Sequence, residues 1–400
     1  MGGLELFAGS GGLALGGSLA GLHHRALIEL NARACRTLER NAALFTAGQK
    51  TPQIICADVR DIDCVALGHI EVVTGGPPCQ PFSLGGKALA YNDKRDLFPA
   101  AIAVIRATRP LAFVLENVKG LLRRSFQPYF AYIIQRLTYP EIELRAGESW
   151  TEHSARLKDI AQRGGVSAAA VARGLSYQVS WQLLQAADYG VPQCRERVFI
   201  VWLRSDVRAK MGSYFVFPQP THAQGRLLYE QYVSHEYWAR QHLAVPAAYS
   251  SKDNCPMQAV QDFARSPLKP WRTLREALTG LPPYAASSVE AQAAGLSGHV
   301  LQRGAKSYAG HTGSVWDWPA KTIKAGVHSV PGGENMIALG EWQVRYLTVR
   351  EAARVQCFPD EYVFADSWSE SMRQIGNAVP VTLAQTVIAA VLKTLRQVSK

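Results

Sequence analysis

One cysteine of this chain stands in a setting suited to nucleophilic chemistry. Cys79 belongs to the run GGPPCQPFS at residues 75–83, which follows the largely apolar run 70–73. Such a run is typical of a buried strand, and the paired prolines fix φ and remove two backbone donors, so the chain leaves the strand along one stiff path. The thiol is then held beyond a strand end, where open α/β sheets bind their ligands. A buried free thiol in a turn is the common alternative, but the surrounding residues favour a nucleophile.

An acid follows another apolar run. Residues 111–115 are continuously apolar, which predicts a central strand buried on both faces. Glu116 comes directly after it. Because it follows the carboxyl end of a central strand, we expect its side chain to point into the same crevice as Cys79.

Two arginines stand between two further predicted strands. Arg195 and Arg197 follow a turn that separates the predicted strands 176–184 and 197–203. On extended backbone, alternate side chains share a face. The alternative is a surface salt-bridge pair, an interpretation that we favour less for Arg195 than for Arg197.

The pattern of the first residues predicts a strand, a glycine turn and a helix. Residues 4–7 form a short apolar strand, AGSGG at 8–12 forms the turn, and 13–22 is apolar with helical character. Small residues at such a turn let a nucleoside approach the backbone. The turn lacks the Gly-Lys-Ser/Thr ending of a phosphate loop, which argues against a nucleoside triphosphate.

Two more acids stand at predicted strand ends behind this turn. Glu29 ends the predicted strand 26–29 and could accept both ribose hydroxyls. Asp58 follows the predicted strand 53–56 and could accept from an adenine amino group. Either acid alone is more often a solvated loop carboxylate, but together they favour a bound adenosine moiety.

Composition limits the class of protein. The chain has 400 residues, of which 48% are hydrophobic and 19% charged, as in a soluble globular enzyme with one large and one smaller domain. We see no apolar run close to the ~20 residues that cross a bilayer and no signal peptide before the first strand, so we expect a cytoplasmic protein without membrane association. The seven cysteines are scattered without a Cys-x-x-Cys pair, which suggests neither a metal site nor a disulfide framework.

The charge indicates a polyanionic partner. The formal net charge is +11 and the pI is about 9.3, which favours nucleic acid binding, although many basic proteins bind none. Basic residues form no block, so we expect them to line a folded groove.

Beyond residue 204 the pattern changes, with weaker periodicity and more Pro, Gly, Trp and His. The run 311–324 mixes aromatic, hydroxyl and basic residues and is our candidate for contacts to base edges and phosphates. It is at least as plausible that Trp316 and Trp318 are core of a small domain. We expect helices at 271–278 and 350–358, and in the second Glu351 and Arg354 are spaced to pair on one face. The possible phosphate clamps are Arg303, Lys306, Lys321 and Lys324.

In this order, the motifs resemble those of the DNA (cytosine-5) methyltransferases, and the resemblance covers most of the chain. The matching segments are 7–12, PPCQ at 77–80, ENV at 116–118, QxRxR at 193–197, REAARVQCFP at 350–359 and GNAVP at 376–380. The resemblance implies a Rossmann-like α/β sheet that binds S-adenosyl-L-methionine, with a second, smaller, irregular target-recognition domain. The change of pattern after residue 204 predicts domains at 1–204 and 205–368, and the residues from 379 to about 395 predict a closing helix. The resemblance implies that this segment, 369–400, returns to the first domain.

Carried over residue by residue, the family's roles fall on named positions. Cys79 matches the nucleophile, Glu116 the acid on the cytosine edge and Arg195 the arginine beside the flipped base. The expected cofactor contacts are Phe7, Gly9, Gly11, Glu29, Asp58, Pro78, Leu97, Asn377 and Ala378. We assign DNA contacts to Ser83 and Lys87, in a loop expected to close over the extruded base, and to Arg197.

The resemblance implies a sequence-specific, monomeric enzyme of a bacterial or phage restriction-modification system, acting on double-stranded DNA. One departure from the family pattern is the segment 140–175, which is longer than the corresponding segment that the shortest family members need. We expect a surface helix there at 150–162. Two alternatives are a tRNA cytosine-5 methyltransferase on the same scaffold, whose second domain would be shorter, and a non-catalytic DNA-binding regulator. The intact Cys79, Glu116 and Arg195 argue against the regulator.

Overall fold

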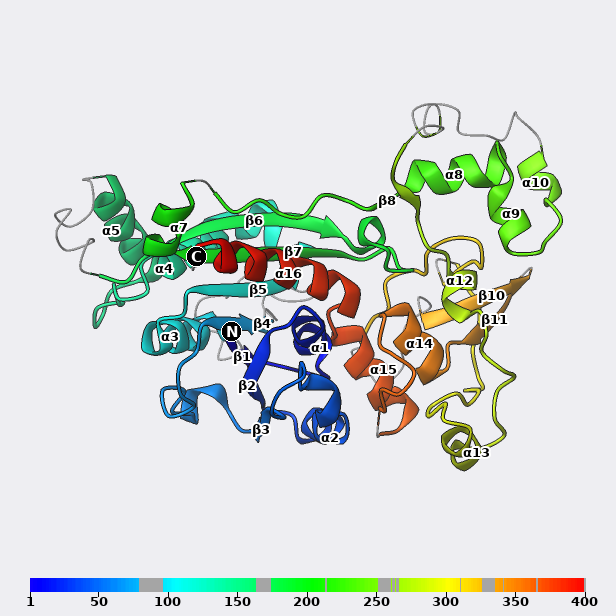
Figure 1. Cartoon of the computed structure of the whole chain (residues 1–400), viewed down its shortest axis with the longest axis horizontal. Coiled ribbons are helices and arrows are strands. Elements are labelled where there is room, and N and C mark those ends of the chain that lie inside the picture. Colours follow the sequence, from blue (N-terminus) through cyan, green and yellow to red (C-terminus); the bar gives the residue numbers. More distant parts are fainter. Residues whose placement is uncertain are drawn as a thin grey trace. The chain divides into compact units, whose positions relative to one another are not determined.

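The chain forms two compact units in a computed structural model that describes residues 1–78, 96–162, 174–212, 214–250, 260, 263, 266–309, 311–325, 335–340, 342–364 and 366–398. Unit 1 comprises Met1–Leu184, Glu196–Phe217 and Ala384–Lys400, and unit 2 comprises Gln185–Arg195 and Pro218–Leu383 (Figure 1). These limits differ from 204 and 368, where we divided the sequence by composition. The functional domain limits therefore stay a prediction.

Unit 1 is built on a seven-stranded sheet with the order β3-β2-β1-β4-β5-β7-β6. The pairs from β3 to β5 are parallel, and β7 runs antiparallel to β5. The strands are β1 (Gly2–Leu6), β2 (His23–Glu29), β3 (Gln53–Cys56), β4 (Val72–Gly75), β5 (Ala112–Val118), β6 (Tyr177–Gln185) and β7 (Glu196–Arg204). The predicted α/β class is confirmed, and every strand predicted from an apolar run is present, with limits shifted by up to three residues.

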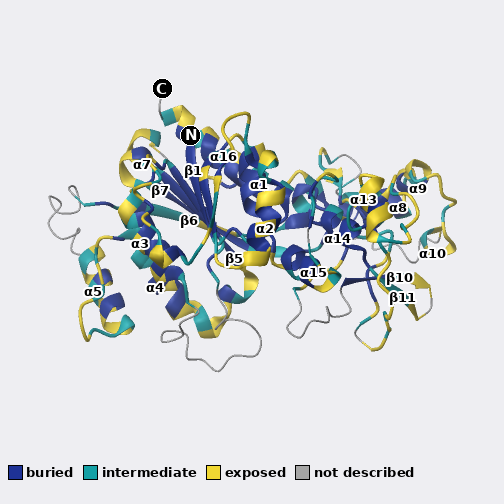
Figure 2. Ribbon diagram, turned by 90° about the horizontal axis from the view of Figure 1, so that it is seen from below, coloured by how far each residue is buried: buried dark blue, intermediate teal, exposed yellow. Residues whose placement is uncertain are grey.

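Apolar side chains explain why these segments form the centre of the sheet. All residues of β1 and β4 are buried, and β5 is buried up to its last residue. Such runs, apolar on both faces, are the signature of parallel strands covered by helices on each side. Helices lie on both sides of the strands (Figure 2).

The helices of unit 1 cover the sheet on its two faces. Phe98 and Ile105 of one helix and Ile133 of another join the main core with Phe113 and Trp202 of the sheet. On α1, a Cβ at Gly17 would lie 3.3 Å from Ile388 of the closing helix, which shows how closely those two helices pack. The helices are α1 (Gly12–Leu19), α2 (Ala32–Arg40), α3 (Phe98–Thr108), α4 (Gln127–Thr138), α5 (Trp150–Gln162), α7 (Ser205–Met211) and α16 (Val381–Val398), with short 3-10 turns at η1 (Ala42–Phe45), η2 (Val59–Asp61), η5 (Lys119–Leu122) and η6 (Arg124–Phe126). A further 3-10 turn, η7 (Ala186–Tyr189), belongs to unit 2.

The predicted surface helix of the extra segment is present as α5. It packs on α4, where the hydroxyl of Tyr132 lies 2.9 Å from Nδ1 of His153 and the rings of Tyr129 and Trp150 meet edge to face at 5.7 Å. Leu157 is fully buried. The helix is therefore a packed part of unit 1.

One helical stretch is apolar and long enough to raise the question of a membrane. Residues Trp368–Val398 pass that test on length and composition, but 67% of the window is buried inside the structure. A buried core helix has the same composition, so this stretch is weak evidence for a membrane segment.

Unit 2 consists of short elements joined by long loops. Two of its helices start with capping boxes, Thr273 with Glu276 and Thr348 with Glu351, each satisfying two otherwise free backbone donors. The elements are α8 (Gln224–Tyr232), α9 (Glu236–Arg240), α10 (Ala247–Ser250), α12 (Leu274–Leu278), α13 (Ser288–Ala293), α14 (Val349–Val355), α15 (Trp368–Asn377), β8 (His222–Ala223), β9 (Lys269–Pro270), β10 (Met336–Gly340) and β11 (Gln343–Tyr346).

The sequence suggested that Glu351 and Arg354 would pair on one face of α14. That prediction is wrong: Glu351 is needed at the capping box and pairs with Arg345 at 2.7 Å, whereas Arg354 pairs with Asp360 at 2.8 Å. Helical spacing brings two side chains within reach of each other, but stronger partners lie elsewhere in unit 2.

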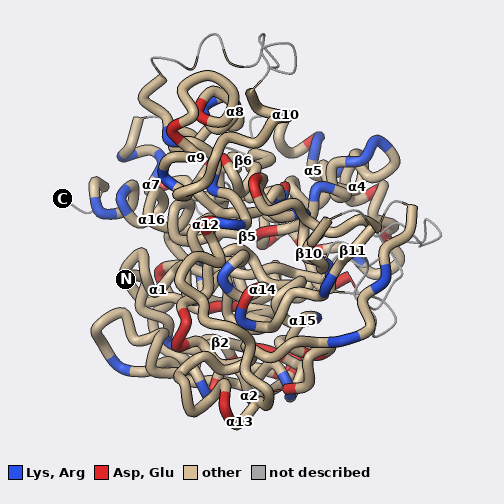
Figure 3. Tube along the Cα trace, turned by 90° about the vertical axis from the view of Figure 1, so that its right-hand side faces the viewer, with Lys and Arg blue, Asp and Glu red and all other residues tan. Residues whose placement is uncertain are grey.

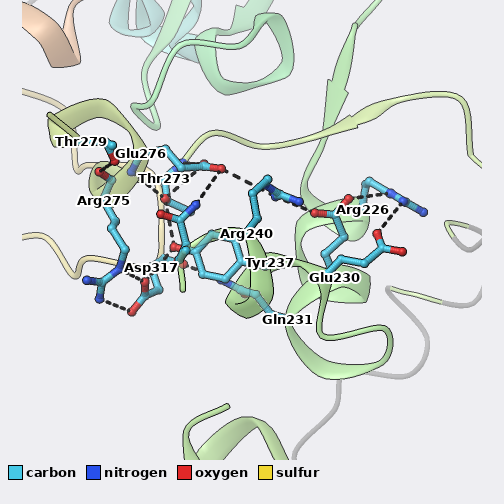
Figure 4. A network of polar contacts seen from close by, with 12 residues as sticks. Arg226, Glu230, Gln231, Tyr237, Arg240, Thr273, Arg275, Glu276, Thr279 and Asp317 are labelled. Atoms are coloured by element: carbon cyan, nitrogen blue, oxygen red, sulfur yellow. Dashed lines mark hydrogen bonds and ion pairs between the residues drawn. The ribbon is translucent and has the colours of Figure 1, made fainter. Parts of the chain in front are cut away.

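A polar network holds the middle of unit 2 together (Figure 4). Arg275 donates to both carboxylate oxygens of Asp317 at 2.6 and 3.0 Å, and the hydroxyl of Tyr237 donates to the same carboxylate at 2.7 Å. On α8 the buried Glu230 accepts from Arg240 at 2.7 Å. The network links α8, α9 and α12 to the loop at Asp317, which offsets the small apolar core of this unit.

Candidate active site

The carboxyl ends of three parallel strands define one edge of the sheet in unit 1. Leu6 of β1 pairs with Gly75 of β4, which in turn pairs with Leu115 of β5. The residues that follow these three, including Glu116, therefore come out at the same edge, where open sheets of this kind bind ligands.

The glycine turn after β1 has the backbone geometry of a ligand cradle. Phe7, Gly9 and Gly11 have φ values of 56°, 54° and 81°, and a left-handed φ is uncommon for a bulky residue such as Phe7. A Cβ placed on Gly9 would meet no described atom within 4 Å. The turn is thus fixed in an unusual conformation and leaves open space beside its backbone.

Glu29 is tied to this turn. One carboxylate oxygen accepts the N–H of Gly9 at 2.8 Å and the other accepts that of Asn31 at 2.7 Å. Each oxygen keeps a second lone pair, so the carboxylate is held in place and can still accept a hydroxyl. This arrangement fits the ribose of a nucleoside.

Asp58 lies at the start of η2, after β3. It accepts two hydrogen bonds from the guanidinium of Arg60, at 2.9 and 2.5 Å, and one from the backbone N–H of Arg60. These bonds lower the pKa of Asp58 to about 2. The group is ionised and acts as an acceptor at neutral pH.

The remaining expected cofactor contacts lie in both units. Pro78 and Leu97 are half-buried in unit 1, Leu97 directly before α3. In unit 2, Asn377 is exposed and Ala378 is buried at the end of α15.

Glu116 forms a buried ion pair with Arg197. Its Oε1 lies 2.9 Å from Nε of Arg197, and the two side chains are only 10% and 13% exposed. Arg197 enters the site because β7 runs antiparallel to β5 and places Arg197 opposite Val118, two residues beyond Glu116. Burial lowers the pKa of Arg197, while Glu116 acts in the opposite direction.

The segment leading to Cys79 starts beside this ion pair. The amide of Asn117 donates to the carbonyl of Pro77 at 3.0 Å, and a Cβ at Gly76 would lie 3.5 Å from Oε2 of Glu116. Cys79, Ser83 and Lys87 lie outside the described residues. Sequence reasoning missed the role of Asn117, although its place directly after Glu116 was a signal.

Arg195 belongs to unit 2 and has different partners. Its guanidinium donates to the carbonyl of Ile323 at 2.9 Å and to those of Gly376 and Ala378 at 2.7 and 3.0 Å, and the residue is 1% exposed. The base-contact role that we predicted for Arg195 therefore fits Arg197 better. The expectation that both arginines share one face did not anticipate that β7 begins between them.

The candidate DNA contacts of unit 2 are solvent-exposed. Arg303, Lys306, Lys321 and Lys324 are all exposed, and Lys321 donates to the hydroxyl of Thr312 at 3.1 Å. Lysines and arginines are spread along the trace between acidic residues (Figure 3).

The two tryptophans of the candidate recognition run differ. Trp318 packs against the small core of unit 2, with its ring 5.8 Å from that of Trp271. Trp316 lies under the guanidinium of Arg275 at 5.5 Å. Trp318 is therefore partly buried against this core, which favours the alternative interpretation for that residue.

Comparison with known proteins assigns this arrangement to a family. The family model described as C-5 cytosine-specific DNA methylase matches residues 1–139 and 169–393, so the extra segment around α5 falls mostly in the unmatched part. The Type II methyltransferase M.NgoMIV of Neisseria gonorrhoeae is 31% identical over 398 residues, covering 98% of each chain. The Type II methyltransferase M.SacI of Streptomyces achromogenes is 30% identical, covering 88% of this chain and 82% of the relative.

Solved structures share the fold. A prophage-encoded E. coli protein, described as a DNA modification methyltransferase, superposes with a TM-score of 0.59 at 19% identity over 99% of each chain. The Dnmt2 methyltransferase of S. pombe gives a TM-score of 0.53 at 15% identity over 98% of each chain.

Proposed function

The chain belongs to the C-5 cytosine-specific DNA methylase family, as a restriction-modification type of DNA (cytosine-5) methyltransferase, and we propose that it methylates carbon 5 of one cytosine within a specific duplex sequence. The observation that supports this most directly is the buried Glu116–Arg197 pair beside the start of the Cys79 segment. The proposed donor is S-adenosyl-L-methionine, and the proposed partner is double-stranded DNA bound by a cytoplasmic monomer.

Carbon 5 of cytosine is a poor nucleophile, and the proposed role of Cys79 is to change that. Its thiolate adds to carbon 6, which turns the ring into an enamine whose carbon 5 can take up the methyl group. A base then removes the carbon-5 proton and the sulfur–carbon 6 bond breaks, restoring the thiolate. A free thiol has a pKa near ~8.5, so a nearby cation favours the reactive form.

Glu116 and Arg197 are proposed to hold the edge of the target ring. Glu116 would accept from the exocyclic amine and, carrying a proton, donate to the ring nitrogen, while Arg197 would donate to the adjacent carbonyl oxygen. Because their ion pair is formed before the base arrives, these groups are already oriented toward the charge that develops as sulfur adds. Asn117 would keep the Cys79 segment in register through its bond to Pro77.

The glycine turn and the acids behind it are proposed to bind the methyl donor, which supplies the methyl group when bound. The fixed carboxylate of Glu29 would accept the ribose hydroxyls, and Asp58 would accept from the adenine amino group. The open space beside Gly9 leaves room for the ligand to lie against the backbone. The family's cofactor roles also fall on Phe7, Gly11, Pro78, Leu97, Asn377 and Ala378.

The target base must leave the helix, because carbon 5 is unreachable within a duplex. Methyltransferases are themselves known examples of base-flipping enzymes, and flipping costs a few kcal/mol. The proposed DNA contacts, Ser83, Lys87, Arg303, Lys306, Lys321 and Lys324, would repay part of that cost. If these and other basic residues make six to ten phosphate contacts, affinity should fall about 10³–10⁵-fold between 50 and 200 mM salt.

The test uses labelled S-adenosyl-L-methionine with duplex DNA or tRNA as acceptor. We expect label in DNA only, and bisulfite sequencing of DNA from an expressing host would identify the modified cytosine. Label only in tRNA would replace the proposal with the tRNA enzyme, and no label in either would leave the non-catalytic regulator.

The nucleophile is tested separately. DNA that carries 5-fluorocytosine at the target should become covalently attached to the wild-type protein in the presence of the donor, because the fluorine blocks release. Cys79→Ser should abolish both the adduct and methyl transfer, while the matched variant Cys64→Ser, at a buried thiol of the unit 1 core, should retain both. Methyl transfer by Cys79→Ser at the wild-type rate would refute the assignment.

A further inference from the structure

We propose that Arg195 is a positioning residue that fixes the turn Gly376-Asn377-Ala378 and thereby the placement of Asn377. This rests on the proposed function, in which Asn377 contacts the methyl donor. The role differs from the base contact that the sequence suggested, and it follows from the bonds that Arg195 makes within unit 2.

Arg195 caps the carboxyl end of α15. The last carbonyls of a helix have no partner within the helix and carry partial negative charge. Nη2 of Arg195 donates to two of them, those of Gly376 and Ala378, at 2.7 and 3.0 Å. A guanidinium presents several donors in a rigid planar fork, so one buried side chain can hold several carbonyls at once.

Two buried glutamines complete the support, and we call Gln193, Arg195 and Gln356 the carbonyl clamp. The amide of Gln356 donates to the carbonyls of Ile375 and Ala378 at 2.7 and 3.1 Å and accepts from Gln193 at 3.1 Å. Both glutamines are fully buried. The carbonyl of Ala378 is therefore held from two sides.

The clamp also holds a second segment. Gln193 accepts the backbone N–H of Ile323 at 3.1 Å, and Arg195 donates to the carbonyl of the same residue at 2.9 Å. Ile323 precedes Lys324, one of the proposed DNA contacts. A Cβ at Gly376 would lie 2.5 Å from the backbone nitrogen of Ala325, so the two segments meet closely and only glycine fits there.

The consequence is a rigid backbone with one projecting side chain. Gly376 and Ala378 are buried and bonded, whereas Asn377 between them is exposed. The backbone from which Asn377 projects is thus held by the buried side chains of the clamp. Pre-organisation of this kind improves binding because less ordering remains to be done when the ligand arrives.

The experiment compares two equally buried arginines. Arg350 is also 1% exposed in unit 2 and donates to the carbonyls of Ser297, Pro359 and Tyr362 at 3.0, 3.0 and 2.7 Å, but not to the turn. A lysine at either position keeps the charge and loses the fork. For Arg195→Lys we expect KM for S-adenosyl-L-methionine to rise about tenfold, which is about 1.4 kcal/mol, with kcat at saturation within about threefold of wild type. Arg350→Lys should leave KM unchanged at a similar loss of thermal stability.

Two readouts do not require methyl transfer. Backbone amides at 374–381 should exchange faster with deuterium in Arg195→Lys but not in Arg350→Lys, and binding of S-adenosylhomocysteine, measured by calorimetry, should weaken only in the former. If Arg195→Lys does not fold, Gln356→Met removes three of the clamp's bonds, those to Ile375, Ala378 and Gln193, and should give a smaller shift of the same kind. If the wild type transfers no methyl group but Arg195→Lys still shows faster exchange and weaker binding of S-adenosylhomocysteine, the proposed function is overturned and the positioning role stands.

The proposal is overturned if Arg195→Lys lowers kcat and leaves KM and exchange unchanged, since that split indicates direct contact with the base. It is equally overturned if both lysine variants raise KM alike, since the effect would then be a general loss of stability.

Discussion

Arg195 and Arg197 are two residues apart, yet they lie in different units and have different partners. Arg197 faces a carboxylate at a sheet edge, with its side chain 13% exposed, whereas Arg195 is 1% exposed and bonded to backbone carbonyls. A charged group paired with one carboxylate keeps donors that can turn to a ligand, while a group shared among several carbonyls serves as a support. The environment of each guanidinium, and not its place in the motif, indicates its role.

Two carboxylates of unit 1 give the same lesson. Glu116 is buried beside Arg197, whose Nε lies 2.9 Å from its Oε1. Glu5 is buried in β1, where it accepts from the hydroxyl of Thr74, and burial raises its pKa to about 8. The first is set up to meet a polar ligand, and the second is a neutral part of the core at pH 7.

The largest effect should follow removal of the charge of Glu116. Glu116→Gln keeps the shape of the side chain but replaces one of its two carboxylate oxygens with an NH₂ group. We expect kcat to fall about 10²–10³-fold, the size of loss seen when one preorganised hydrogen-bonding group is removed from an active site. Single-turnover methylation measures this. Binding of S-adenosylhomocysteine should be unchanged, and an unchanged kcat would remove Glu116 from the chemistry.

A smaller loss should separate the two arginines. Arg197→Lys retains a charge near Glu116 without the planar fork, so kcat should fall about 10–100-fold while KM for the donor stays near wild type. Arg195→Lys should give the reverse pattern. If kcat falls more in Arg195→Lys than in Arg197→Lys, our assignment of the two roles is reversed.

Titration of Glu5 should make stability depend on pH. Its pKa is about 8 in the folded state and near 4.5 when unfolded, so the folded protein binds more protons between these values and stability falls as pH rises from about 4.5 to 8. The slope is about 1.4 kcal/mol per pH unit. Glu5→Gln should remove it, as measured by urea denaturation at a series of pH values.

The cleanest window for that measurement is pH 6.5 to 8. Burial lowers the pKa of His24 from 6.5 to about 4, so between these values the unfolded protein binds a proton at His24 that the folded protein does not. Stability therefore falls as pH drops below 6.5. The two slopes oppose each other below that pH. A wild-type stability that does not change between pH 6.5 and 8 would contradict a neutral Glu5.

The smallest effect concerns the polar network of unit 2. Asp317→Asn weakens the bonds to Arg275 and Tyr237, and we expect unfolding free energy to fall by about 1–2 kcal/mol because charge-assisted bonds are lost. The matched change is Asp206→Asn, which breaks the Arg204–Asp206 pair, whose carboxylate is 58% exposed. That pair should contribute less than about 1 kcal/mol. Equal losses would mean that the network adds no stability beyond a surface pair.

Much of unit 1 could be predicted because its signals are local. The continuous apolar runs identified the strands, β3 covering the same residues as predicted, and the glycine turn and Glu29 came out joined by a hydrogen bond. Parallel strands place their carboxyl ends at one edge whatever the loops between them. Unit 2 has short elements and polar links, so periodicity gave little beyond the helices near 274 and 349.

The residue types and their order alone determined the family, the strand-ending acids and the cysteine motif. What only the tertiary structure decided is which partners each of the two arginines has. The three carbonyls that the Arg195 guanidinium binds are 128, 181 and 183 residues away in the chain, and Arg197 meets Glu116 because β7 pairs antiparallel with β5. A side chain's function depends on the groups that share its surroundings, and contacts over such separations are set by the packing of the whole unit, which no local pattern encodes.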